Sequence, residues 1–187
     1  MQIVDGHAAA EPLLRAAAAL LVEGFREHWP EAWPTLADAV AEVDEMLAPE
    51  RVMLVAVEGE DVLGWVGGIP TYDGLVWELH PLVVAADQRP AQALPAPVGE
   101  LEAVCAARGG LTMVLGSDDE ANMTSLGGAD IFPDLLGNLA AIRNLRGHPF
   151  EFYQRLGFSL SGIVPDANGF GKPDILLAKR IARPPGA

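Results

Sequence analysis

Residues 77–84 read Trp-Glu-Leu-His-Pro-Leu-Val-Val and set two titratable side chains in an otherwise apolar run. Such a run predicts a buried strand, which we expect to extend from Leu75 to Val84. Successive side chains of a strand point to opposite faces. One face is therefore predicted to carry Glu78, His80 and Leu82, and the other Trp77, Leu79 and Val83. A buried carboxylate beside an imidazole is costly unless a site uses both, so a functional site and a water-facing strand end are equal alternatives.

The segments on either side of this strand predict a mixed α/β domain. Two strands are expected upstream, over residues 51–58 and 62–69. Two helices precede them, after a short strand expected at 2–4. Thr35 with Asp38 has the spacing of a capping box at the start of the second helix. The elements expected downstream are a helix to about 108, a strand over 111–116, a helix near 134–145, a short helix after Pro149, and strands over 158–164 and 174–181. No linker separates them, so residues 1–187 are predicted to form a single domain, a mixed and mostly antiparallel sheet with helices on both faces.

The charge of the chain limits its partners. The formal net charge is −14. Of the twelve basic residues only two are lysines, Lys172 and Lys179. Nucleic-acid binding requires a basic surface and is therefore not predicted. An acidic surface attracts cations, which suggests a polycationic small molecule as a ligand. The alternative is that the charge only keeps an apolar chain in solution.

Two further features limit compartment and chemistry. Cys105 is the single cysteine, which excludes an internal disulfide and fits a reducing cytoplasm. It lies in an alanine-rich helical stretch, where a buried structural thiol is expected. The N-terminus lacks the pattern of a signal peptide, and no apolar run is long enough for a membrane span. A cytoplasmic protein without membrane contact is therefore predicted, and no metal site is expected.

Several uncommon motifs occur in an order that resembles one family. Besides WELHPLVV, they are HWPEAW (28–33), LAPERV (47–52), GWVGGIPTY (64–72), RGGLTMVLGSDDE (108–120), IRNLRGHPFEFYQRLGF (142–158) and IVPDANGFGKPDILLAKR (163–180). Over roughly residues 28–182 the chain looks like the aminoglycoside 6′-N-acetyltransferases of the GNAT superfamily. The resemblance implies a splayed sheet whose central strand ends beside the pantetheine arm of acetyl-CoA. It also implies direct acetyl transfer to a primary amine in a ternary complex, and a homodimer.

The resemblance assigns roles to particular residues. Glu78 matches the residue that deprotonates or orients the amine, and His80 is expected to assist it. Leu82 matches a position whose backbone N–H points at the thioester carbonyl, and Val83 and Val84 continue this cofactor-binding strand end. Tyr153 matches the tyrosine that donates to the leaving thiolate; the alternative is an aromatic ring packed under the sheet.

Two groups of residues are candidates for binding the substrate. Asp118, Asp119 and Glu120 follow a strand end, where ligand-binding loops commonly lie. Three consecutive acids usually form a solvated turn, but for a polyamine substrate they are candidate ammonium ligands. Trp29, with Trp33, is a candidate wall of the sugar site, and core packing is the equal alternative.

The expected coenzyme A loop departs from the family pattern. Most GNAT proteins follow the central strand with Q/R-x-x-G-x-G/A, whose backbone amides bind the pyrophosphate. Here Arg89 keeps the first position, Gln92 replaces the first glycine and Ala93 follows it, but Leu94 stands where the last glycine belongs. Three prolines in this segment also remove backbone donors. The alternatives to an aminoglycoside acetyltransferase are therefore a weak or inactive GNAT-fold protein that binds a cationic ligand, and an acetyltransferase of another small amine or of a protein.

Overall fold

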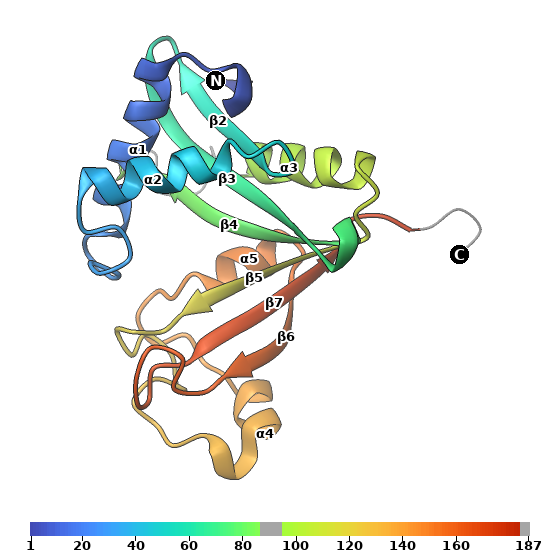
Figure 1. The fold of residues 1–187 in the computed structure, drawn as a ribbon. Coiled ribbons are helices and arrows are strands. Elements are labelled where there is room, and N and C mark those ends of the chain that lie inside the picture. Colours follow the sequence, from blue (N-terminus) through green and yellow to red (C-terminus); the bar gives the residue numbers. More distant parts are fainter. Residues whose placement is uncertain (87–94, 184–187) are drawn as a thin grey trace. The chain divides into compact units, whose positions relative to one another are not determined.

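The structure is a computed structural model that describes residues 1–86 and 95–183 (Figure 1). The chain divides into two compact units. The first runs from Met1 to Met113 and takes in the described residues from Ile181 onward, and the second runs from Val114 to Arg180.

The first unit contains a twisted antiparallel arrangement of four strands. In spatial order these are β1 (Gln2–Asp5), β2 (Val52–Glu58), β3 (Asp61–Thr71) and β4 (Val76–Val84). Each strand pairs antiparallel with the next. The apolar run of residues 77–84 thus lies in β4, and the prediction of a strand from Leu75 to Val84 is confirmed to within one residue.

Helices cover both faces of these four strands. On one face lie α1 (Glu11–Phe25) and α2 (Leu36–Met46), whose side chains share a buried cluster with Trp65 and Val83. On the other face α3 (Pro95–Ala107) brings Leu101 and Cys105 against the strands. Cys105 is fully buried, and burial raises the pKa of its thiol to about 12. The thiol therefore stays protonated at neutral pH and is not a nucleophile, which agrees with the structural role expected of Cys105.

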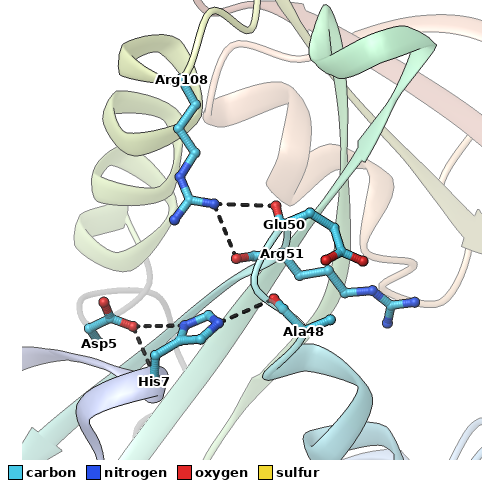
Figure 2. Close-up of polar contacts among 6 residues, drawn as sticks. All are labelled: Asp5, His7, Ala48, Glu50, Arg51 and Arg108. Carbon is cyan, nitrogen blue, oxygen red and sulfur yellow. Dashed lines mark hydrogen bonds and ion pairs between the residues drawn. The ribbon is translucent and has the colours of Figure 1, made fainter.

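Helix α2 is held at both ends. At its start, Thr35 and Asp38 form the predicted capping box, in which each side chain accepts from the other residue's backbone N–H. Beyond its end, the loop to β2 is fixed by polar contacts (Figure 2). Arg108 donates to the carbonyl oxygens of Glu50 and Arg51, each at 3.2 Å, and Nε2 of His7 lies 3.2 Å from the carbonyl oxygen of Ala48. Helix α2 is therefore a rigid support for any side chain it presents to the sheet.

A β-bulge in β4 reverses the predicted faces beyond His80. Val66 pairs with Leu82 but Gly68 pairs with Leu79, so two residues of β4 lie opposite Gly67 alone. A Cβ atom on Gly67 would collide with the His80 carbonyl group, which is why glycine is needed there. The extra residue shifts the alternation by one position. Leu82 thus lies on the α3 face with Trp77 and Leu79, while Val83 lies on the α1/α2 face with Glu78 and His80. The prediction placed Leu82 and Val83 the other way round and was wrong.

The second unit pairs short strands with two short helices. Its strands are β5 (Thr112–Asp118, beginning in the first unit), β7 (Asp174–Arg180) and β6 (Ser159–Val164), in that spatial order. Strands β6 and β7 are antiparallel. The helices are α4 (Leu135–Ala140) and α5 (Phe150–Arg155), both of which contact β6. The helix predicted near 134–145 ends at Ala140, and Asn144 forms an isolated bridge with Thr124.

The predicted fold class is confirmed. Both units combine strands with helices, and β1–β4 and β6–β7 pair antiparallel. The order of elements also follows the prediction, with 3-10 turns added at Gly6–Ala8, Tyr72–Gly74 and Phe132–Asp134.

Candidate active site

Glu78 and His80 lie on the α1/α2 face of β4. Both are partly exposed, in a strand whose other members are mostly buried. Glu78 is opposite Ile69 of β3, which packs against the core under α1 and α2. Its carboxylate makes no hydrogen bond or ion pair with any residue in the ranges 1–86 and 95–183. A carboxylate held on a strand without a protein partner is available to a ligand amine.

His80 is in contact with a glutamate of α2 and a tryptophan of the loop before it. Its Nε2 atom lies 3.8 Å from Oε1 of Glu42, and its ring centroid lies 5.8 Å from that of Trp33. The other carboxylate oxygen of Glu42 accepts a hydrogen bond from the Trp33 indole at 3.3 Å. The imidazole, the indole and the carboxylate therefore form one cluster.

Aromatic rings continue from this cluster toward the end of α1. Phe25 contacts Trp33 with ring centroids 4.7 Å apart, and Trp29 at 5.7 Å. His28 in turn contacts Trp29 at 5.5 Å. Trp29 and Trp33 are half-buried, and both rings pack on Phe25. Trp29 and Trp33 were both predicted to line the acceptor site. Trp33 contacts His80 of β4, whereas Trp29 remains a candidate.

The positions expected to bind the cosubstrate divide into two groups. The side chains of Leu82 and Val84 line a small apolar pocket together with Leu63 and Pro97. Val83 is buried in the core under α1 and α2. The role expected of residues 82–84 depends on their backbone N–H groups, so the placement of their side chains does not test it. Arg89, Gln92, Ala93 and Leu94 lie outside the described residues.

Tyr153 belongs to the second unit and is carried by α5. It is half-buried, and its ring meets those of Phe152 and Phe158 with centroids 5.3 and 6.0 Å apart. Its hydroxyl group makes no hydrogen bond with the part of the chain that the structure describes. Burial raises the pKa of this phenol, so it is protonated at neutral pH and can donate.

A buried histidine holds the start of α5. His148 is 2% exposed, and its Nδ1 accepts a hydrogen bond from the backbone N–H of Phe150 at 3.2 Å. Nε2 must then carry the proton, and it faces the carbonyl oxygen of Asp118 at 3.2 Å. Asn144 exchanges two hydrogen bonds of 2.8 Å with the His148 backbone. These bonds link the helix that carries Tyr153 to the end of β5.

The neutral state of His148 predicts a pH-dependent stability. Burial lowers the pKa of His148 below its usual value of 6.5, against smaller opposing effects of Asp118 and Asp119. Because the unfolded chain then binds the proton more readily, the stabilisation is complete above the unfolded pKa and is lost as pH falls through the folded pKa. We expect Tm to fall between about pH 7.5 and pH 5.5. In His148→Gln, which cannot be protonated, Tm measured by calorimetry should be lower and should change less over this interval. An equal pH dependence in both proteins would contradict the prediction.

The three acids after β5 have different surroundings. Asp119 is fully buried, and its carboxylate accepts hydrogen bonds from the backbone N–H groups of Met123 and Thr124 and from the Thr124 hydroxyl. It therefore holds the loop together and does not face a substrate, which corrects the expectation for this residue. Asp118 accepts from the side chain of Asn168. Asp118 and Glu120 are partly exposed and stay candidate ammonium ligands.

Glu42 and His148 were not predicted from the sequence. Glu42 lies on a helix whose pattern of polar residues is typical of a solvated face, so no local signal marked it. His148 precedes Pro149 in a loop, and only the contacts of the folded chain show that its ring is enclosed. Pairs of residues far apart in the chain, such as Glu42 and His80, are not visible in one sequence.

The described residues contain neither a metal-binding group nor a membrane-spanning helix. No group of three or more His, Cys, Asp or Glu side chains within residues 1–86 and 95–183 could hold a metal ion. Over the same ranges, none of the helices is both long and apolar enough to cross a membrane.

Comparison with known proteins identifies the family. No protein-family model and no curated sequence matches the chain. Solved structures do match. An aminoglycoside 6′-N-acetyltransferase complexed with coenzyme A is 38% identical, with a TM-score of 0.89, and the match covers 99% of each chain. An aminoglycoside 6′-N-acetyltransferase from Enterococcus faecium is 38% identical over 99% of each chain, with a TM-score of 0.88.

A third match, also an aminoglycoside acetyltransferase, has a lower TM-score. The aminoglycoside 6′-acetyltransferase type Ii is 34% identical, with a TM-score of 0.72, over 99% of this chain and 100% of that one. Coenzyme A in the first of these structures agrees with acetyl-CoA as the cosubstrate. The chain belongs to the GNAT family of acetyl-CoA-dependent N-acetyltransferases, within which it is similar to the aminoglycoside 6′-N-acetyltransferases.

Proposed function

We propose that this acetyltransferase moves the acetyl group of acetyl-CoA to a primary amine of a polycationic substrate, the 6′-amine of an aminoglycoside. The observation that carries the proposal is the carboxylate of Glu78, which lies beside His80 on β4 and has no hydrogen-bond or ion-pair partner within residues 1–86 and 95–183. The similarity to three aminoglycoside 6′-N-acetyltransferases supports the choice of substrate. The net charge of −14 agrees with a cationic ligand.

In the proposed reaction, Glu78 takes a proton from the substrate ammonium, directly or through a water molecule. The free amine then attacks the thioester carbonyl carbon and forms the new C–N bond. The backbone N–H of Leu82 stabilises the oxygen as it gains negative charge. As the C–S bond breaks, the Tyr153 hydroxyl donates a proton to the departing thiolate. The nitrogen gives up its second proton, which returns to the Tyr153 phenolate through water, and Glu78 releases its own proton to solvent. The products are the N-acetylated amine and coenzyme A.

The other expected properties are also proposals. We propose that Trp29 and Trp33 form a wall of the acceptor site, and that Asp118 and Glu120 bind further ammonium groups. Arg89, Gln92, Ala93 and Leu94 are proposed to bind the pyrophosphate of acetyl-CoA. A homodimer is proposed from the family resemblance. A single functional domain is proposed because no linker interrupts the sequence, and a cytoplasmic location because the single cysteine fits a reducing compartment.

The substrate preference provides the test. Initial rates of thiol release from acetyl-CoA should be highest with kanamycin-like aminoglycosides, compared at equal concentration with a neutral amine and with a peptide N-terminus. KM for the aminoglycoside should rise as salt increases from about 0.05 to 0.5 M, because salt screens the charges in an open site. A neutral amine serves as the control, since its KM should not respond. A preference for the peptide or the neutral amine would favour a protein or small-amine acetyltransferase.

A further inference from the structure

We infer that Glu42 is a positioning residue, which fixes the orientation and tautomer of His80 so that Nδ1 of the imidazole faces the reaction. The inference rests on the function proposed above. It concerns a closed triangle of side chains: Glu42 on α2, Trp33 in the loop between α1 and α2, and His80 on β4.

Each member of the triangle contacts the other two. Oε2 of Glu42 accepts from the indole Nε1 of Trp33 at 3.3 Å, and Oε1 lies 3.8 Å from Nε2 of His80. The Trp33 and His80 rings are 5.8 Å apart between centroids and inclined by 44°. A flat ring that touches a carboxylate at one edge and an indole beside it has few orientations left.

The burial of Glu42 makes its charge effective. Its side chain is 17% exposed, whereas that of His80 is 41% exposed. A carboxylate this far from water needs partners, and the Trp33 indole supplies one for a single oxygen. The other oxygen faces Nε2 at a distance longer than a hydrogen bond but within ion-pair range. In a partly buried site the attraction between the carboxylate and an N–H on Nε2 is stronger than it would be in water.

The position of the charge selects one nitrogen for the proton. In a neutral imidazole one ring nitrogen carries hydrogen and the other a lone pair. The partner of one nitrogen determines which of the two carries the hydrogen. A carboxylate beside Nε2 favours hydrogen on Nε2. The lone pair is then on Nδ1, which has no hydrogen-bond partner within residues 1–86 and 95–183. Nδ1 is thus the atom that accepts from the substrate amine or from a water molecule between them.

The surroundings of Glu42 suit a positioning role. Helix α2 is capped by Thr35 and Asp38, and contacts from His7 and Arg108 fix the loop that follows it. His80 lies opposite Gly67 in the bulge, whose backbone geometry limits the path of β4. The carboxylate and the imidazole are therefore carried by two supported elements, which keeps their separation constant.

Glu42→Gln separates positioning from packing. Glutamine keeps the size of the side chain and an oxygen that can accept from Trp33, but it removes the charge beside His80. We expect kcat for an aminoglycoside to fall about tenfold, within the range of coupling between residues in contact. KM for acetyl-CoA should be unchanged. Glu45→Gln is the matched control on the same helix, since Glu45 is exposed and pairs with Arg51; it should leave the rate unchanged.

A double-mutant cycle and NMR complete the test. In a His80→Gln background, Glu42→Gln should cost less than about twofold, because its effect passes through the imidazole. An undiminished loss would overturn the inference. Independently of activity, the ring ¹⁵N signals of His80 should show hydrogen on Nε2 in the wild type and a shift toward a tautomer mixture in Glu42→Gln. A wild-type ring with hydrogen on Nδ1 would also overturn it. An absence of acetyl transfer with the expected NMR result would reject the proposed function and leave the Glu42–His80 relation supported.

Discussion

Replacing Glu78 by glutamine is expected to lower kcat/KM for acetyl transfer by about 10²-fold or more, the usual cost of losing a positioned general base. A primary amine is protonated at neutral pH, so the reaction needs an acceptor for its proton. Glutamine has nearly the same shape but cannot take the proton or attract the ammonium group. Initial rates with a kanamycin-like substrate, over a range of substrate and acetyl-CoA concentrations, measure the loss.

The stability of Glu78→Gln should stay close to that of the wild type. Glu78 is partly exposed and makes no hydrogen bond with the described part of the chain, so no protein partner is left unpaired. The control is Glu60→Gln in the turn between β2 and β3, which removes the same charge at an exposed position. Its activity and Tm should both be unchanged. Wild-type kcat/KM in Glu78→Gln would exclude Glu78 from the mechanism.

Most of the secondary structure could be predicted because its signals are local. The capping box of Thr35 and Asp38 and the apolar run of β4 are each contained within a few residues, and both are present in the structure. Helix α5 likewise begins directly after Pro149, as expected. Hydrophobic periodicity and helix-start signals are therefore sufficient for these elements.

The bulge in β4 shows where a local pattern is insufficient. Strict alternation predicts the same face for His80 and Leu82, but the extra residue opposite Gly67 moves Leu82 to the other face. Pro81 is the one local sign, since proline cannot donate to a strand ladder and is common at bulges. Proline within the run is compatible with a bulge, but it does not show how the faces are divided after it.

The candidate site was only partly predictable for a related reason. Glu78 and His80 were identified because a carboxylate and an imidazole are unusual on an apolar strand. Glu42 was not, because its role depends on Trp33 and His80, which approach it only in the folded chain. Conversely, Asp119 looked like part of a solvated acidic turn, and its burial follows from backbone donors that need an acceptor.

Asp119→Ala is expected to lower the free energy of unfolding by about 3 kcal/mol or more. The carboxylate accepts from the N–H groups of Met123 and Thr124 and from the Thr124 hydroxyl, all in a fully buried position. Each donor left unsatisfied in the interior costs about 1–3 kcal/mol, although water entering the space of the lost side chain offsets part of the sum. Urea unfolding monitored by circular dichroism gives the change.

The neighbouring acid provides the comparison that separates structure from binding. Glu120 is partly exposed, so Glu120→Ala should change stability by less than about 0.5 kcal/mol. If Glu120 binds a substrate ammonium group, this variant should raise KM for the aminoglycoside instead. Asp119→Ala should show the opposite division: a large loss of stability, with KM close to the wild-type value at temperatures where the protein stays folded. A stable Asp119→Ala protein with a raised KM would mean that the carboxylate binds the substrate. That result would contradict the prediction that Asp119 only stabilises the loop.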